Sequence, residues 1–388
     1  MNFRINNLFL LSLILAVVIL PQSLSAQSGP GNTKHVKVYY EKGMFGGWPA
    51  NFGIWNWGDE ILVGFAKGYY KDLGPEMHNI DRQKPELHLL ARSLDGGETW
   101  KIEDPCSTGK GALFVPNHGS YHGIERTDVK LSDIVECKGI DFENPDLAFT
   151  VRMTNTNGGE SLFWYSSDRG HEWKGPCLLP EFDTKGTAGR TDYIVEGKND
   201  CKLFVTAAKS NGKEGRVMCV KTTDGGKSWA FVSWIGPEPA EGYSIMPASV
   251  RLTDSEILVA VRKNKSIGAF ISSDNGLTWN ELTEPVKDTG EGNPPAVIKM
   301  KDNRICLVYG SRKKPFSICA KLSSDKGKTW SDPYIVREDG SGRDMGYPRI
   351  MQRSDGKIVA IYYFQDALTG PERYIGCTIW TPPAKGNN

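Results

Sequence analysis

The sequence predicts an all-β protein, and two repeated features support this prediction. The first is an eight-residue motif that occurs five times, in the order Ser or Thr, any residue, Asp, any residue, Gly, any residue, Thr or Ser, and Trp. Successive copies begin 73, 56, 50 and 51 residues apart, a spacing that indicates an array of similar structural units. The copies read SLDGGETW from Ser93, SSDRGHEW from Ser166 (with Glu at the seventh place), TTDGGKSW from Thr222, SSDNGLTW from Ser272 and SSDKGKTW from Ser323.

The second feature is a set of short strands around each motif. A start that contains Gly, Asn or Pro leads into an alternating strand, as in YSIMPASVR from Tyr243 and GYPRIMQR from Gly346, and an apolar run such as EILVAVRKN follows. About four short strands per unit, separated by turn residues, predict a single β-propeller of four-stranded blades. Six units can be counted. The early strand HVKVYYEKG, from His35, is expected to complete the last blade, and residues 101–141 leave room for an irregular extra blade.

The repeated motif, an Asp box, is predicted to be structural. Its Asp can accept hydrogen bonds from turn amides, its Gly can adopt the positive φ of a tight turn, and its Trp begins the next strand. A functional site grafted on a fold rarely recurs in every unit. We therefore expect the five aspartates to hold turns rather than to perform catalysis.

The N-terminus predicts export from the cytoplasm. Arg4 precedes an apolar run from Leu8 to Leu20, and small residues follow up to Ala26. This order is typical of a signal peptide, and the run is short for a membrane span. We predict a signal peptide over 1–26 and one propeller domain over 27–388, in a secreted or periplasmic protein that has no membrane partner after cleavage.

Composition limits the remaining classes of function. The net charge of +1, without clustered Lys and Arg, argues against a nucleic-acid partner. No Cys or His spacing suggests a zinc site. No cofactor is certain, and a Ca²⁺ ion that supports the fold or neutralises a substrate carboxylate stays an open alternative. Four cysteines in apolar strands are expected to be buried free thiols, namely Cys201, Cys219, Cys306 and Cys319.

The candidate site follows from propeller geometry, because the first residues of the innermost strands converge on one face. The loop PNHGSYHGIERT supplies His118, Tyr121 and His122 as candidate catalytic groups, since imidazole exchanges protons at neutral pH. Arginine binds carboxylates in a bidentate manner, which favours an acidic oligosaccharide or polysaccharide as substrate. The alternative without a functional role is that these are solvated loop histidines and surface arginines. The candidate substrate-binding residues are Arg190, Tyr243, Asn293, Tyr347 and Arg349.

Three stretches resemble one family of propellers over nearly the whole mature chain: GGWPANFGIWNWGDEILVGFAKGYYKD, IDRQKPE and GYPRIMQRSDGKIVAIYYF. These are the rhamnosyl-glucuronate-cleaving proteins of glycoside hydrolase family 145 and polysaccharide lyase family 42. The resemblance implies a seven-bladed propeller that acts on terminal L-rhamnose-α-1,4-D-glucuronate of arabinogalactan side chains, such as those of gum arabic. The likeness to sialidases is more distant, because their Arg-Ile-Pro motif is replaced here by Trp48-Pro49-Ala50-Asn51.

The same resemblance bears on the reaction. Hydrolase members of that family carry a His directly after this Asn, and here the residue is Phe52, which cannot transfer a proton. A lyase needs a cation to neutralise the uronate carboxylate, and His or Tyr to move protons. Our leading hypothesis is therefore a lyase that works by β-elimination. The alternatives are an α-L-rhamnosidase that is inactive or impaired at Phe52, and a non-catalytic sugar-binding propeller.

Overall fold

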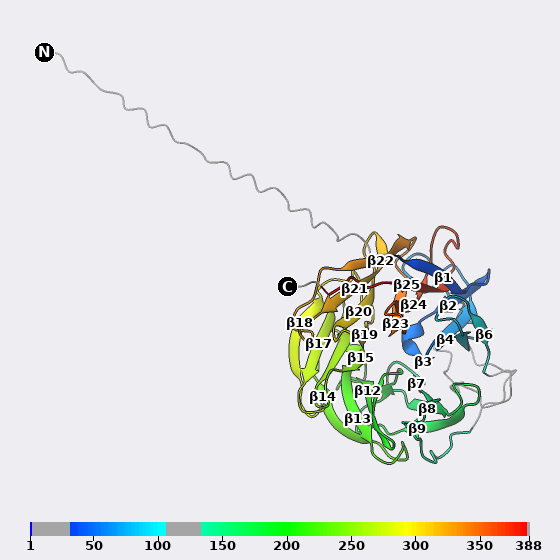
Figure 1. Ribbon diagram of the computed structural model, residues 1–388, viewed down its shortest axis with the longest axis vertical. Helices are drawn as coiled ribbons and strands as arrows, with labels where there is room; N and C mark the ends of the chain where they lie inside the picture. Colours follow the sequence, from blue (N-terminus) through cyan, green and yellow to red (C-terminus); the bar gives the residue numbers. More distant parts are fainter. Residues whose placement is uncertain (2–31, 106–132, 386–388) are drawn as a thin grey trace.

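The computed structural model describes residues 32–105 and 133–385, together with Met1. In these residues the strands form six antiparallel sheets arranged in a ring, with one short 3-10 turn, η1 (Pro49–Asn51). Figure 1 shows the ring from one end. The predicted β-propeller fold is confirmed, whereas the predicted signal peptide lies outside the described residues.

The six sheets are numbered here as blades in chain order. Blades 1 and 3 to 6 are given from the innermost strand outward, and the three strands of blade 2 correspond to the outer three strands of the others, because its Asp box joins β8 and β9. Blade 1 contains β2 (Met44–Gly47), β3 (Ile54–Trp57), β4 (Glu60–Tyr69), β5 (Leu87–Ser93) and β6 (Lys101–Glu103). Blade 2 contains β7 (Ala148–Met153), β8 (Ser161–Ser166) and β9 (Lys174–Leu179). Blade 3 contains β10 (Thr187–Ala188), β11 (Tyr193–Gly197), β12 (Asp200–Ala208), β13 (Glu214–Thr222) and β14 (Ala230–Ile235).

The other three blades have four strands each. Blade 4 contains β15 (Ile245–Arg251), β16 (Ile257–Arg262), β17 (Ile267–Ser272) and β18 (Asn280–Val286). Blade 5 contains β19 (Ala296–Lys299), β20 (Ile305–Ser311), β21 (Phe316–Ser323) and β22 (Tyr334–Gly340). Blade 6 contains β23 (Gly346–Gln352), β24 (Ile358–Phe364), β25 (Tyr374–Trp380) and β1 (Lys34–Tyr39).

The ring closes as expected, because β1 pairs antiparallel with β25 as the outer strand of blade 6. Blades 1 and 2 pack directly against each other, with Trp55 and Leu62 of blade 1 against Leu162 and Trp173 of blade 2. The rings of Trp55 and Trp173 lie 5.7 Å apart. Because this contact leaves no room for another blade between them, the described residues form six blades, as counted from the sequence. The seven blades implied by the family resemblance are corrected to six.

The Asp boxes hold turns, as predicted. In the fourth copy, the carboxylate of Asp274 accepts hydrogen bonds from the backbone amides of Leu277 and Thr278, at 3.1 and 2.9 Å, and from the Thr278 hydroxyl at 2.5 Å. These bonds, led by the Thr278 hydroxyl, lower the pKa of Asp274 to about 2. Gly276 has a φ of 87°. Trp279 donates from Nε1 to Ser233 on the neighbouring strand β14, at 2.9 Å.

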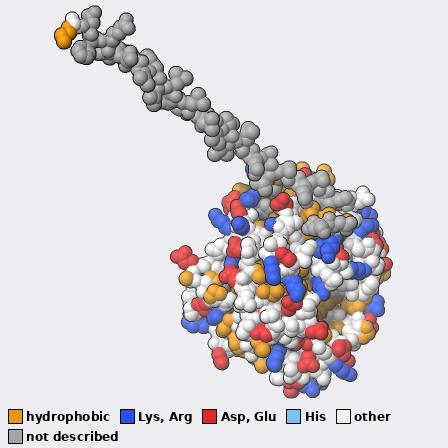
Figure 2. All heavy atoms as spheres, turned by 60° about the vertical axis from the view of Figure 1, so that its left-hand side comes forward, with side chains coloured by type: hydrophobic (Ala, Val, Ile, Leu, Met, Phe, Trp, Pro, Cys, Tyr) orange, Lys and Arg blue, Asp and Glu red, His pale blue; other side chains and the backbone are white. Residues whose placement is uncertain are grey.

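The interior is apolar and the exterior is mixed in charge. Cys201, Cys219, Cys306 and Cys319 are buried free thiols, which confirms the prediction for them. On the face shown in Figure 2, basic and acidic side chains alternate, without a large patch of one sign. No helix in the described part of the chain is long and apolar enough to span a membrane.

One face of the ring carries the loops that matter for the site. We call it the upper face; it bears the loops that precede each innermost strand and the loops between the second and third strands. Since adjacent strands are antiparallel, both sets of loops lie at the same end of each blade that has all four strands. In blade 2 the Asp box follows β8, as it follows the third strand of the other boxed blades, so its β7–β8 loop lies at this end. The innermost strand β19 contacts both β15 and β23 near the middle of the ring (Figure 1).

Candidate functional site

Arginines from three blades meet at the η1 turn of blade 1. Arg152 of β7 donates to the carbonyl oxygen of Asn51 at 3.3 Å, and Arg190 of blade 3 donates from Nε to Asn51 Oδ1 at 3.1 Å. Arg349 of β23 donates to the carbonyl oxygen of Ala50 at 2.8 Å. We call these five residues the hub. Its hydrogen bonds join blades 2, 3 and 6 to blade 1.

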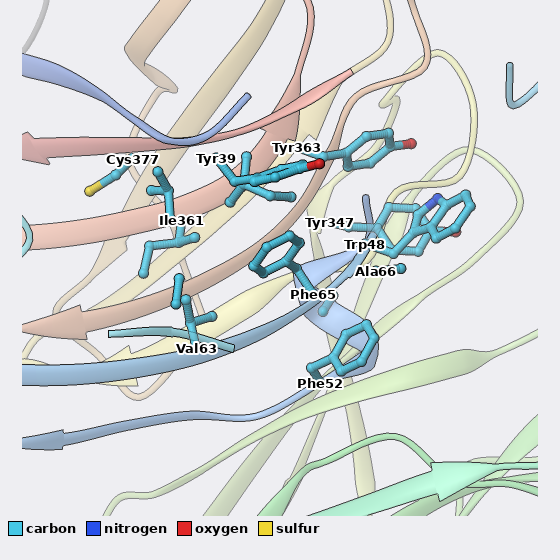
Figure 3. Close-up of a cluster of buried hydrophobic side chains, with 14 of the residues drawn as sticks. Tyr39, Trp48, Phe52, Val63, Phe65, Ala66, Tyr347, Ile361, Tyr363 and Cys377 are labelled. Atoms are coloured by element: carbon cyan, nitrogen blue, oxygen red, sulfur yellow. The ribbon is translucent and has the colours of Figure 1, made fainter. Parts of the chain in front are cut away.

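Prolines shape the chain around the hub. Met246 and Tyr347 each precede a proline at the start of an innermost strand, and Trp48 precedes Pro49 directly after β2. Each of the three has a positive φ, between 51° and 56°. Such a backbone costs about 1–3 kcal/mol in a non-glycine residue and persists only where packing holds it. Trp48 is buried against Tyr363, with ring centroids 6.3 Å apart, and Figure 3 shows Tyr347 beside them. The tight starts of these strands leave little space at the axis.

Two predicted binding residues, Arg190 and Arg349, come together at the hub. They line a cavity of about 10 Å³ whose other walls include Pro247, Pro294 and Pro295. Arg190 also pairs with Glu214 at 3.3 Å. Because this volume corresponds to about one water molecule, the cavity does not admit a sugar ring. A role of Arg190 and Arg349 in substrate binding stays a prediction.

The other predicted binding residues organise the surroundings of the hub. Arg262 donates to the hydroxyl oxygens of Tyr347 and Tyr243, at 2.7 and 3.2 Å. Asn293 is fully buried; it donates to the carbonyl oxygen of Met345 at 2.8 Å and accepts from the amide of Tyr347 at 3.2 Å. In the structure, Asn293 therefore supports the start of β23.

The remaining sequence-predicted positions differ in what can be said of them. Phe52 is buried, with its ring 3.6 Å from the guanidinium centre of Arg152 and edge-on to His88 at 5.4 Å. At this end of blade 1, next to the hub, the Phe52 ring packs against its neighbours and makes a cation–π contact with Arg152. The predicted catalytic residues His118, Tyr121 and His122 lie outside the described residues.

A larger cavity opens on the upper face, where blades 5, 6 and 1 meet. Its volume is about 770 Å³, within the range typical of small-molecule sites. We call it the lateral pocket. It is lined by the loops 72–79, 341–343 and 365–373 and by residues that follow β20. Its charged lining residues are Asp72, Glu76, Arg312, Lys314, Arg343, Asp366 and Arg373.

A buried carboxylate organises the wall of the lateral pocket. Asp344 is 2% exposed, and its Oδ1 lies 2.8 Å from His78 Nδ1 and accepts from the Tyr363 hydroxyl at 2.5 Å. Its Oδ2 accepts from Arg373 Nε at 3.1 Å. Burial alone would raise the pKa of Asp344, but His78, Arg373 and Arg312 hold it well below its usual range. Asp344 is therefore a fixed negative charge.

This arrangement can orient a proton-transfer group. A carboxylate at Nδ1 holds an imidazole in one orientation and tautomer, with Nε2 as the basic nitrogen. His78 is 30% exposed and lies in the loop that lines the pocket, between Glu76 and Asn79. The rings of His78 and Trp48 also pack in a T-shaped arrangement, with their centroids 5.2 Å apart. The group His78–Asp344 thus has the geometry of a positioned acid–base pair.

The three arginines of the lateral pocket are neutralised to different degrees. Arg373 is bound to Asp344, and Arg343 pairs with Glu76 and Glu291. Arg312 donates to the Tyr363 hydroxyl at 2.9 Å, while its carboxylate neighbours Glu291 and Asp344 stand at 3.8 Å. Among the three arginines, Arg312 therefore has the weakest acidic partners and is the one best suited to meet an anionic ligand.

Sequence reasoning did not single out His78 or Arg373. It noted Asp344 among the polar residues at blade starts and Arg312 at a strand end, but chose neither as a catalytic or binding residue. The signal for Arg312 is its position in the repeat. It directly follows the second strand of blade 5, and Arg262 is the last residue of the second strand of blade 4. His78 stands in the loop KDLGPEMHNID, where no repeated pattern distinguishes it. Within the residues the structure describes, no three His, Cys, Asp or Glu side chains are grouped as a metal site requires.

Comparisons with known proteins agree with this architecture. The family model for BNR repeat-like domains matches residues 147–360. A protein of unknown function from Dyadobacter fermentans has a similar structure, with a TM-score of 0.66 and 16% identity over 90% of this chain and 99% of that chain. No curated protein sequence matches the chain.

Sialidases are also among the similar structures. A mutant of Trypanosoma rangeli sialidase that displays trans-sialidase activity has a TM-score of 0.59 and 12% identity, over 91% of this chain and 59% of the sialidase. The NanB sialidase of Streptococcus pneumoniae has a TM-score of 0.55 and 12% identity, over 85% of this chain and 68% of that chain. At these identities the likeness shows a shared sialidase-like propeller fold.

Proposed function

Since the chain belongs to the family of BNR repeat-like domains, we propose that it is a carbohydrate-active enzyme. Its substrate is an acidic saccharide, terminal L-rhamnose-α-1,4-D-glucuronate of arabinogalactan side chains, and its reaction is β-elimination. One observation carries the proposal: a pocket of about 770 Å³ lined by three arginines, with a His–Asp pair in the adjoining loop and wall. The sialidase-like fold supports a saccharide ligand.

Arg312 of the pocket and the adjoining His78–Asp344 pair can divide the chemistry between them. Arg312 neutralises the uronate carboxylate, which stabilises the charge that develops when C5 loses its proton. His78 takes that proton, and Asp344 stabilises the resulting imidazolium. The electron pair of the C5–H bond forms the C4–C5 double bond, and the C4–O bond breaks. The rhamnosyl oxygen leaves with that bond's electron pair and receives the proton held by His78.

The loop residues His118, Tyr121 and His122 remain an alternative proton-transfer group within this proposal. Arg190 and Arg349, with Tyr243, Asn293 and Tyr347, likewise remain an alternative uronate site. One variant of each group separates the two assignments of the proton-transfer group. If His78 is the base, His78→Ala abolishes elimination while the double variant His118→Ala/His122→Ala retains it. The reverse result would move the chemistry to the loop.

The deciding experiment is incubation of the purified protein with gum arabic. We expect ultraviolet absorbance from an unsaturated uronate to rise, together with free rhamnose. Lys265→Ala serves as control, because Lys265 is an exposed residue on the same face, outside the lateral pocket. Rhamnose release without the chromophore would indicate the α-L-rhamnosidase alternative. Binding of the saccharide with neither product would indicate a sugar-binding propeller.

A further inference from the structure

The hub contains cations that lack acidic partners. Among residues 32–105 and 133–385, no Asp or Glu oxygen forms an ion pair within 4 Å of Arg152 or Arg349. Arg152 donates to the carbonyl oxygen of Asn51, and Arg349 donates to those of Ala50 and Thr191. Arg152 is buried and Arg349 is part-buried, and a cation that is removed from water and paired only with neutral dipoles is costly. The hub therefore favours the uptake of negative charge.

The nearest acids do not balance these cations. Glu214 pairs with Arg190, and Glu86 attracts Arg152 from beyond ion-pair distance. Asp192 accepts from the amide and hydroxyl of Ser249, both at 3.1 Å, and burial raises the pKa of Asp192 to about 7. Burial also lowers the pKa of Arg152 to about 9 and of Arg349 to about 10, values at which both remain protonated at neutral pH. The hub thus has an excess of positive charge.

The shape of the hub cavity limits what can enter it. Its volume is about 10 Å³, roughly that of one water-sized particle. The walls are Ala50, Met246, three prolines that lack an N–H group, and the two guanidiniums of Arg190 and Arg349. The Nε atom of Arg349 makes no hydrogen bond with the described residues. A suitable occupant accepts hydrogen bonds, carries negative charge, tolerates apolar walls and consists of a single atom.

We propose that the hub binds one chloride ion between the guanidiniums of Arg190 and Arg349, against the wall formed by Pro247, Pro294 and Pro295. The ion neutralises the hub and strengthens the junction of blades 1, 3 and 6. Carboxylate, phosphate and sulfate groups are larger than this volume and would require the walls to move apart. This site is independent of the lateral pocket, so that its test does not depend on any reaction with a saccharide.

Two measurements on the full chain test the chloride site. In crystals soaked in sodium bromide, we expect an anomalous difference peak between Arg190 and Arg349. In solution at constant ionic strength, exchange of gluconate for chloride from 1 to 100 mM should raise the Tm by about 3–5 °C, as expected for a ligand that binds only the folded state.

Variants assign the effect to the hub. Arg349→Met should remove the chloride dependence of the Tm, while Arg343→Met, on the rim of the lateral pocket, should keep it. If Arg349→Met does not fold, the bromide peak in the wild type decides the question. The proposal is overturned if the hub shows no bromide peak, if the Tm is equal in chloride and gluconate, or if Arg349→Met keeps the full chloride effect.

Discussion

The hub and the lateral pocket lie on the same face and both contain three arginines, but they differ in what those arginines contact. At the hub the guanidiniums bond to backbone and amide oxygens, three of these bonds going to the η1 turn, and only Arg190 also meets a carboxylate, that of Glu214. A cavity of about 10 Å³ remains there. In the lateral pocket the arginines contact carboxylates and a tyrosine around a space of about 770 Å³. Proline-containing segments close the axis, whereas the long loops 72–79 of blade 1 and 365–373 of blade 6 leave room for a ligand.

The largest expected effect is on turnover, and it separates the two regions. Arg312→Gln should lower kcat/KM for elimination by about 10²–10³-fold, the usual effect of losing one group that stabilises developing charge. Arg190→Gln, the matched hub variant, should leave the turnover per folded molecule within a few-fold of the wild type. The measurement is the rate of unsaturated-uronate formation on gum arabic, normalised to folded protein. A larger loss in Arg190→Gln would place the uronate at the hub.

A second prediction concerns the stability of the hub. Asn51→Ala removes the side-chain acceptor of Arg190, and a hydrogen bond to a charged group contributes about 1.5–3 kcal/mol. We expect the free energy of unfolding to fall by about 2 kcal/mol, with little change in turnover. Asn264→Ala, at an exposed position of the upper face, is the control. Denaturant unfolding checks this, and an unchanged midpoint for Asn51→Ala would mean that the hub bonds do not hold the blades.

The Asp boxes predict acid sensitivity that is independent of both regions. The folded-state pKa of Asp274 is about 2, below the unfolded value of about 3.9. Its stabilisation is therefore fully present above about pH 4 and lost as the pH falls toward 2. Asp274→Asn should lower the free energy of unfolding by about 1 kcal/mol at pH 6 and by less at pH 2. A Tm difference from the wild type that does not shrink on acidification would contradict this account.

The smallest expected effect concerns Phe52. The wild type should release rhamnose only together with the unsaturated uronate, because an apolar ring occupies the position of the expected proton-transfer group. Phe52→His, packed against Arg152 and His88, should add a slight hydrolytic release of rhamnose. Efficient release by the wild type with addition of water, measured as saturated glucuronate, would show that this replacement does not prevent hydrolysis.

Much of the architecture could be predicted from the repeats, whereas the lateral pocket could not. The spacing of the Asp boxes indicated blades, and the strand that begins near His35 was expected to close the ring, as β1 does. Family resemblance suggested a seventh blade, which the packing of Trp55 on Trp173 contradicts. The axial arginines were recognised as a group, but their backbone partners were not visible in the sequence.

The sequence by itself determined the strands, the turns and the order of the blades, because these depend on local residue types and on a pattern that repeats. Only the tertiary structure decided which polar groups meet. His78 comes from a loop of blade 1, Asp344 from the loop before blade 6 and Arg312 from blade 5, and ring closure brings them together. Contacts between residues far apart in the chain depend on how the blades pack, and no local pattern encodes that arrangement.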